Sequence, residues 1–241
     1  MKTKALFLFG TLAALLFGWL TICAVCDPKE PSYDGHTLSQ WMVLYYNTYH
    51  PETAPPNFAQ KKEQVEKSET AVKAIGTNAI PTALRWLSGS YDVRDYFHIS
   101  AFNEGYPLDG MAETILAILG EDAQPAVSAL IQIAESNKSA KTRIVALRLL
   151  EKIEKNRTVI IPVFIRCAKG DKDAKVREYA LGDVVELVGL DRKTGEELTS
   201  ALLNDPDQKV RHEAKLFNEQ LDFFFPDSSD DAIETNNIQN K

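Results

Sequence analysis

Two internal periods constrain the fold of this chain more than any other feature of its sequence. Residues 69–81 (ETAVKAIGTNAIP) and 113–125 (ETILAILGEDAQP) share five identities, each 44 residues apart and without a gap. A second period, of 34 residues, relates the segments that begin at Thr142, Val176 and Val210. Self-similarity at such periods is typical of stacked helical repeats, in which each unit buries its apolar face against the next.

Apolar residues within the repeated segments follow the period of an α-helix. Val176, Ala180, Val184 and Leu187 fall at positions i, i+4, i+8 and i+11 and therefore share one helix face. The stripe of the preceding helix type, which starts at Val127, returns 34 residues later. A pair of such helices buries both stripes only against neighbouring pairs. The sequence therefore predicts an all-α fold built from stacked helix pairs.

Some of the repeated residues carry a family resemblance. Residues 171–180 and 205–214 share the pattern D-x-D-x-K-V-R-x-x-A, and the segments AIPTAL and AQPAVSAL each place a proline at a helix start. These features resemble the HEAT-repeat family. The opening YDGHTLSQWM, followed by AVKAIGTNAIPTALRWL, is similar to small exported bacterial HEAT-repeat proteins of unassigned role. The resemblance covers roughly residues 33–221 and implies a right-handed α-solenoid of about four to five antiparallel helix pairs, a fold used as a scaffold in many systems.

The predicted repeat domain occupies residues 37–221. We expect helices over residues 37–47, 58–75, 79–88, 109–119, 123–136, 140–154, 158–168, 174–188, 192–203 and 208–221. Gly76 follows a helix rather than a strand, and the further glycines of a phosphate-binding loop are missing. We therefore expect Gly76 to end one helix in a left-handed conformation and Pro81 to lie in the first turn of the next, with Gly120 and Pro125 as their copies.

Three arginines recur at one repeat position: Arg143, Arg177 and Arg211. Asp171 and Asp205 stand six residues before the second and third of them. The HEAT resemblance implies that each arginine binds the aspartate of the preceding turn through charge-assisted hydrogen bonds. We predict that these residues are structural staples rather than an anion-binding ladder. Short polar residues at another repeat position are expected to be N-caps: Ser139, Asp173 and Asp207.

The N-terminus differs from the rest of the chain. Lys2 and Lys4 precede an uncharged run of 22 residues, from Ala5 to Cys26. This run is longer than the usual core of a signal peptide, about 7 to 15 residues, and is long enough to span a bilayer. We expect residues 1–26 to be a signal-anchor in the inner membrane, followed by a linker over residues 27–36, with the repeat domain outside the cytoplasm. The alternative is a cleaved signal peptide and a secreted or periplasmic domain.

The charge balance excludes one class of partner. Residues 27–241 carry 25 basic and 34 acidic residues, because two of the 27 lysines and arginines precede this part. Nucleic-acid binding requires a basic face, and an acidic domain offers no general attraction to it. We therefore expect no nucleic acid among the partners, and contact with the membrane only through the N-terminal helix.

The residue types that carry chemistry form no catalytic constellation. Cys167 is the one cysteine after the N-terminal run, and it falls at an apolar repeat position, where we expect a core residue. His36, His50, His98 and His212 lack the spacing of a metal site. Trp41 and Trp86 each lie on an apolar stripe and are expected in the core. We predict no catalytic, cofactor-binding or metal-binding residues and no enzymatic activity.

The segment 88–107 breaks the repeat period. It contains several aromatic residues and a histidine, which form the candidate interaction patch: Tyr91, Tyr96, Phe97, His98, Phe102 and Tyr106. Insertions in repeat proteins often lie on the binding face, whereas the alternative here is an irregular helix pair that fills a gap in the stack. Residues 222–241 open with DFFFP, which we expect to cover the end of the last repeat, and continue as a disordered acidic tail.

These expectations lead to a functional hypothesis. The chain is predicted to be a non-catalytic protein-binding or scaffold module, tethered to the membrane, that binds an unknown protein partner in the cell envelope. One alternative is an enzyme-like or small-ligand-binding domain with a concave groove near residues 91–106, where Asp92, Arg94, Asp95 and His98 would converge. A second alternative is a purely structural spacer.

Overall fold

The computed structural model describes residues 30–49, 55, 57–90, 107–186 and 191–224, and within them the chain is all-α apart from one short hairpin. The all-α class predicted from the sequence is therefore confirmed. The helices are α2 (Leu38–Asn47), α3 (Phe58–Ile75), α4 (Ile80–Ser88), α6 (Leu108–Leu119), α7 (Val127–Ser136), α8 (Ala140–Ile153), α9 (Arg157–Gly170), α10 (Ala174–Glu186), α11 (Arg192–Leu202) and α12 (Gln208–Phe224). The predicted helices match these closely, since the apolar stripes and caps determine both ends.

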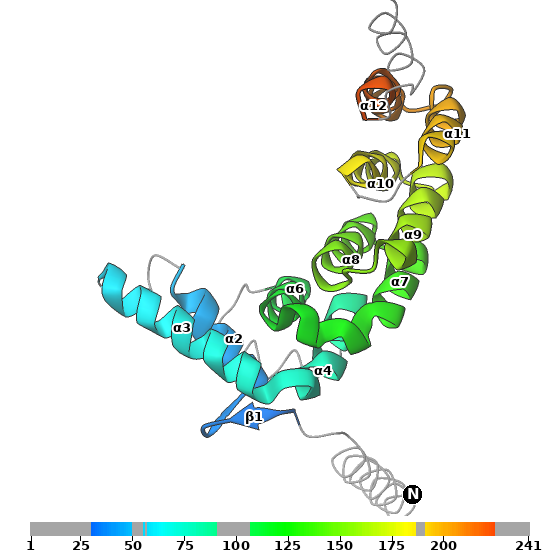
Figure 1. Ribbon diagram of the computed structural model, residues 1–241. Coiled ribbons are helices and arrows are strands. Elements are labelled where there is room, and N and C mark those ends of the chain that lie inside the picture. The colour runs from blue at the N-terminus through cyan, green and yellow to red at the C-terminus, as the bar shows by residue number, and fades with distance from the viewer. Residues whose placement is uncertain (1–29, 50–54, 56, 91–106, 187–190, 225–241) are drawn as a thin grey trace, which may run out of the picture.

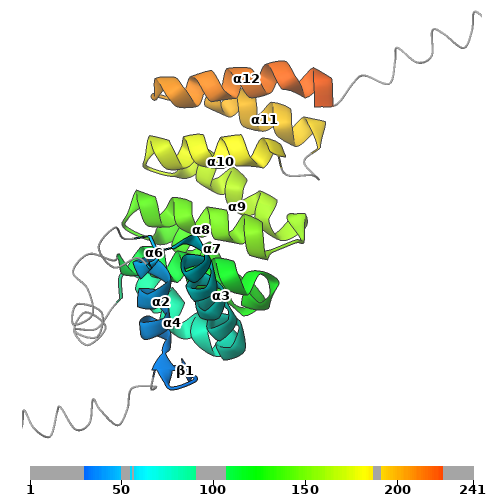
Figure 2. The same cartoon turned by 90° about the vertical axis from the view of Figure 1, so that its left-hand side faces the viewer.

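The helices lie in two rows that curve together (Figure 1). We call α6, α8, α10 and α12 the inner row, because they line the concave side, and α4, α7, α9 and α11 the outer row. Each outer helix packs against an inner one, as α7 does on α8, α9 on α10 and α11 on α12. At the N-terminal end α2 packs on α3, and Figure 2 shows α3 on the concave side of the inner row.

The core runs without interruption along the molecule. It begins at Leu38 in α2 and ends at Leu221 in α12, so no part of the stack has a separate core. Three members of the predicted α10 stripe, Val176, Ala180 and Val184, have no exposed surface, and the fourth, Leu187, lies outside the described residues. One core therefore extends through the helix pairs that the structure describes.

A β-hairpin occupies part of the predicted linker. Strands β1 (Ser32–Tyr33) and β2 (His36–Thr37) pair antiparallel around Asp34 and Gly35, whose φ angles are 46° and 76°. Two positive φ angles define the tight turn that suits a hairpin. The indole N–H of Trp41 donates to the carbonyl oxygen of Tyr33 at 2.9 Å. Trp41 is consequently half-buried and holds the hairpin on α2, whereas Trp86 is in the core as predicted.

The repeated glycines end their helices, but in a different conformation from the expected one. Gly76 has φ 62° and ψ −142°, and Gly120 has φ 56° and ψ −124°. The positive φ is as predicted, but these ψ values lie outside the left-handed helical region, in space that is almost restricted to glycine. A 3-10 segment follows each glycine, η1 (Gly76–Ala79) and η2 (Gly120–Ala126). Pro81 lies in the first turn of α4 as predicted, whereas Pro125 lies in η2, before α7 begins.

Arginine–aspartate pairs connect consecutive repeats. The Nε and Nη2 atoms of Arg143 donate to the two carboxylate oxygens of Asp171 at 2.7 and 2.6 Å. Arg177 binds Asp205 in the same way, at 2.8 and 2.7 Å. Both pairs are almost entirely buried, and each joins an inner-row helix to the turn that starts the next one. The hydrogen bonds with Asp171 raise the pKa of Arg143, and those with Arg177 lower the pKa of Asp205.

The predicted hydrogen bonds of Arg177 to Asp171 and of Arg211 to Asp205 form, but not with the carboxylates. The Nη1 atom of each arginine instead donates to the backbone carbonyl oxygen of that aspartate, at 2.8 and 2.6 Å. The Oδ1 atom of each aspartate accepts from the amide two residues later, at 2.8 Å in both turns. This bond orients the carboxylate toward the arginine of the preceding repeat. The predicted side-chain caps are confirmed at Ser139, Asp173 and Asp207.

The side chain of Phe223 does not cover the end of the last repeat. Helix α12 continues through the DFF sequence to Phe224, beyond the predicted end at residue 221. Phe223 is 83% exposed, so the expectation that this side chain covers the end of the stack is wrong. Residues 225–241 lie outside the described part of the chain.

Candidate interaction site on the concave face

The six residues of the aromatic candidate patch all lie outside the described residues, as do Asp92, Arg94 and Asp95. The structure therefore neither brings them together nor separates them. The surfaces that can be described are those of the two rows and of α2 and α3. The candidate site is built here from these surfaces.

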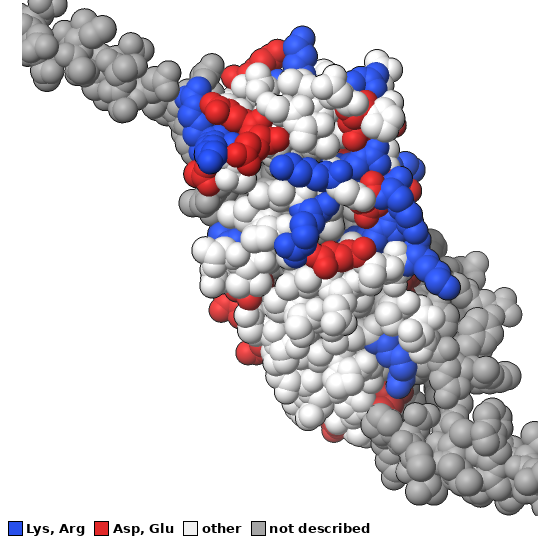
Figure 3. Space-filling view, turned by 90° about the vertical axis from the view of Figure 1, so that its right-hand side faces the viewer, with Lys and Arg blue, Asp and Glu red and all other residues white. Residues whose placement is uncertain are grey.

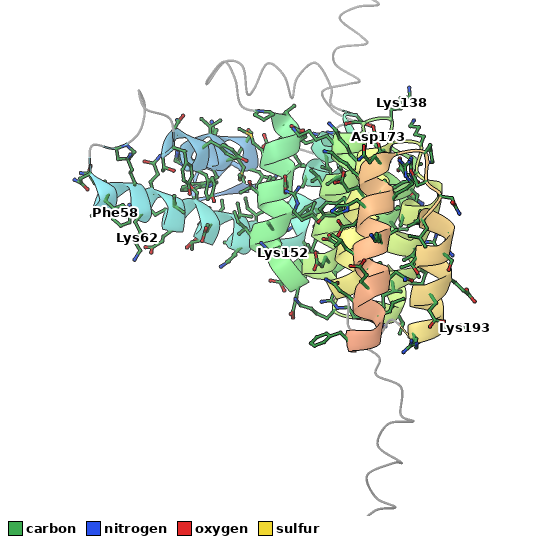
Figure 4. The ribbon with its side chains drawn as sticks, turned by 90° about the horizontal axis from the view of Figure 1, so that it is seen from above. Phe58, Lys62, Lys138, Lys152, Asp173 and Lys193 are labelled. Carbon is green, nitrogen blue, oxygen red and sulfur yellow. The ribbon has the colours of Figure 1, made fainter. Side chains whose placement is uncertain are left out.

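A groove of about 450 Å³ lies where α2 and α3 meet the inner row. Its lining comes from four helices and consists of Tyr45, Glu69, Lys73, Glu113, Thr114, Ala117, Ile118 and Lys152. Figure 4 views the stack from above and shows Lys152 beside α6, in the angle between α3 and the stacked helices. Apolar surface from α6 and charges of both signs are therefore combined at one place on the concave side.

The longer repeat period explains why two carboxylates face this groove. Glu69 and Glu113 are the first identities of the 44-residue repeat, one on α3 and one on α6. Because α3 and α6 pack together, equivalent positions of the two helices contribute to the same groove. Sequence reasoning used this repeat to predict the fold and missed its polar members. The signal in the sequence was the repetition of a glutamate, a residue type that core packing does not require.

Three charged side chains of the groove have no ion-pair partner within the described residues. Glu113 pairs with Arg148 of α8 at 2.7 Å. In contrast, no salt bridge to Glu69, Lys73 or Lys152 forms in the described part of the chain, although Glu69 and Lys73 are four residues apart on α3. Their charges are therefore available to a partner.

Tyrosines hold the wall of the groove. The hydroxyl of Tyr46 lies 2.8 Å from that of Thr114 and so connects α2 to α6. The Tyr45 ring contacts the rings of Tyr46 and Tyr49, with centroids 5.6 and 5.7 Å apart. Burial, together with a hydrogen bond to Tyr49, raises the pKa of Tyr45 to about 12. The hydroxyl is neutral at physiological pH, as an unperturbed tyrosine also is, and offers hydrogen bonding rather than charge.

A second hollow, of about 730 Å³, lies between the outer helices α4 and α7. Arg85 and Lys138 are its charged residues, and it ends at Ser90, next to the residues that are not described. Figure 3 shows that the outer face near α4 carries few charged side chains, whereas lysines and arginines gather toward α9 and α11. This hollow lacks the opposite charges of the concave groove and is the weaker candidate.

The residues considered for chemistry are placed as core or surface residues. Cys167 is buried, its Sγ lies 3.8 Å from the carbonyl oxygen of Ala134, and burial raises its pKa to about 11. His212 is exposed. His50 and His98 lie outside the described residues. Among the residues that are described, no group of three or more histidines, cysteines or acidic residues is placed to hold a metal ion.

Comparisons with protein-family models, curated proteins and solved structures give no match.

One described stretch, Leu108–Ser136, is long and apolar enough to cross a membrane by length and composition alone. It comprises α6, η2 and α7, and several of its apolar side chains belong to the core. Core helices commonly meet the same criterion, so this stretch gives weak support for a membrane span. The predicted anchor, residues 1–26, lies outside the described residues.

Proposed function

We propose that this chain is a right-handed α-solenoid of the HEAT-repeat type that acts as a non-catalytic protein-binding scaffold. In this proposal residues 1–26 tether it to the membrane and the repeat domain faces the outside of the cytoplasm. The observation that carries the proposal is the concave groove, which combines apolar surface with three charged side chains that form no ion pair in the part of the chain that is described. Stacked repeats typically bind their partners on such a concave surface.

The chemistry of the groove favours a protein segment as its occupant. Ala117 and Ile118 can contact an apolar side chain, while Glu69, Lys73 and Lys152 can bind groups of opposite charge. Charges on both sides of an apolar centre give specificity and orientation to a bound segment. A nucleic acid or an anionic lipid would meet the carboxylates of Glu69 and Glu113, which repel it.

Photocrosslinking in the cells that produce the full chain tests this proposal. A benzoylphenylalanine at Ala117 samples the groove, and one at Gln132, an exposed residue of α7, samples the outer face. We expect an adduct of defined mass between Ala117 and a second protein, and none from Gln132. A structural spacer gives no face-specific adduct, and that result would count against the scaffold proposal.

A charge exchange on α3 provides the matched pair of variants. Glu69→Lys with Lys73→Glu reverses two groove charges without changing the net charge. The control, Lys62→Glu with Glu66→Lys, makes the same exchange on the exposed part of α3, where the two side chains are 3.6 Å apart. Both exchanges alter helix stability by only a few tenths of a kcal/mol. We expect the groove exchange to abolish the Ala117 adduct and the control exchange to preserve it.

A further inference from the structure

Arg211 occupies the repeat position of Arg143 and Arg177, but it lacks their carboxylate. Its Nη1 donates to the carbonyl oxygens of Asp205 and Pro206, at 2.6 and 3.0 Å, which is the backbone contact of the earlier arginines. Its Nε and Nη2 atoms, which bind aspartate in the earlier repeats, have no hydrogen-bond partner within the described residues. The guanidinium is therefore positioned and open on the side that faces the end of the stack.

The end of the stack is suited to a polar occupant. Positions four and seven residues after the repeat arginine share its helix face, and in the earlier repeats they are buried and apolar. In α12 both positions are exposed and polar: Leu147 and Leu181 become Lys215, and Leu150 and Val184 become Asn218. Another repeat packed here would bury Lys215 together with its ion-pair partner Glu219, whose Oε1 lies 3.8 Å from the Lys215 Nζ, and taking such a pair out of water is costly. This argues against an apolar face, including that of a second copy, as the occupant.

We propose that the acidic segment that follows α12, residues 225–241, returns along this helix and places a carboxylate on Arg211. The segment contains one basic residue, Lys241, and four acidic ones: Asp227, Asp230, Asp231 and Glu234. It would meet two cations on one face of α12, since Lys215 is exposed one turn after Arg211. The segment thereby supplies in cis the carboxylate that the next repeat supplies to the earlier arginines.

The length of the segment after Phe224 determines which of its carboxylates can reach Arg211. Phe224, the last residue of α12, is 13 positions from Arg211, or about 20 Å along the helix axis. An extended chain covers about 3.3 Å per residue, so six or seven residues span this distance. Asp230 and Asp231 therefore lie at the required separation. Because the segment is tethered, its effective concentration is on the order of millimolar, well above that of a free peptide in a cell.

Zero-length carbodiimide crosslinking tests the proposal on the full chain in detergent micelles. A mixture of unlabelled and ¹⁵N-labelled protein separates links within one copy from links between copies. We expect amide links from Lys209 or Lys215 to Asp230 or Asp231 within one copy, with a yield that falls at least threefold in Arg211→Gln and in 1 M salt. Arg166→Gln, on the exposed surface of α9, is the control and should leave the yield unchanged.

A second readout does not depend on the stability of an Arg211 variant. The Nε–H signal of Arg211 in NMR spectra should shift in Asp230→Asn with Asp231→Asn, and it should stay in place in Glu197→Gln, a change on the exposed surface of α11. Links that join differently labelled copies would assign the site to a second molecule and overturn the proposal. The absence of both the internal link and the shift would overturn it as well. Neither readout involves the concave groove, so this test is independent of the scaffold proposal.

Discussion

Removing the carboxylate of Asp171 tests whether the arginine–aspartate pairs hold consecutive repeats together. Asp171→Ala deprives Arg143 of hydrogen bonds at 2.6 and 2.7 Å and removes the acceptor for the Asp173 amide. The Arg143 and Asp171 side chains are 2% and 5% exposed, so solvent screens the unpaired charge little. Breaking a buried pair by removing one partner costs about 3–5 kcal/mol, and we expect a loss of stability in this range.

Thermal unfolding followed by circular dichroism measures this loss. For a domain of this size each kcal/mol lowers Tm by about 2–4 °C, so Asp171→Ala should lower it by roughly 10 °C. Lys172→Ala changes an exposed residue of the same turn and should stay within about 0.5 kcal/mol of the original chain. A loss in Asp171→Ala no larger than that in Lys172→Ala would refute the reasoning.

A double-mutant cycle identifies the arginine that binds Asp171. Asp171→Ala and Arg143→Met should be coupled by about 1–3 kcal/mol, because either change alone breaks the same pair. Asp171→Ala and Arg177→Met should be nearly additive, since Arg177 contacts only the backbone of Asp171 within the described structure. Coupling to Arg177 instead of Arg143 would restore the pairing expected from the sequence.

Three further outcomes follow from the fold. Gly76→Ala should lower the free energy of unfolding in urea by about 1–3 kcal/mol. The cost should come from the φ of 62° alone, because a Cβ at this position meets no atom within 4 Å. Gly170→Ala is the control and should be close to neutral, since that position is equally open but has no positive φ. Folding lowers the pKa of Asp205 below its unfolded value of about 3.9. The ionised carboxylate should therefore stabilise the fold fully above that pH and lose this effect as the pH falls through the folded pKa. Asp205→Asn should remove this part of the acid dependence of stability. Cys167 should react with N-ethylmaleimide at pH 7 only slowly until denaturant is added, since its thiol is buried and its pKa is about 11; a fast reaction in the folded chain would contradict its placement.

Those parts of the fold that depend on local pattern were predictable. The stripe through Val176, Ala180 and Val184 determines which face of α10 is buried, and the caps at Asp173 and Asp207 determine where α10 and α12 begin. Spacing along the chain could not give the partners of the repeat arginines. Each aspartate lies six residues before one arginine in the sequence, but its carboxylate binds the arginine of the preceding repeat. This pairing depends on how closely the repeats stack, which the spacing along the chain does not show.

The candidate site was less predictable than the fold, for two physical reasons. Its lining comes from four helices, and sequence alone does not show that Tyr45 of α2 and Lys152 of α8 face one groove. Aromatic content drew attention to the insert, because aromatic residues often anchor interfaces. Glutamates and lysines on a helix surface do not by themselves indicate a binding site, since most such side chains are solvated.

The repeat itself separates structure from function at this groove. Of the identities in the 44-residue period, Gly76 and Gly120 are required by their φ angles, and Ala79 with its copy is buried. Glu113 has a structural role in its pair with Arg148, but no such pair forms at Glu69 within the described residues. Glu69 is therefore an identity that neither backbone geometry nor, within the described residues, an ion pair explains. A half-exposed carboxylate beside an apolar surface, with two lysines that form no ion pair within the described residues, suits the recognition role proposed for the groove. The charge exchange at Glu69 and Lys73 is therefore the sharpest test of the scaffold proposal.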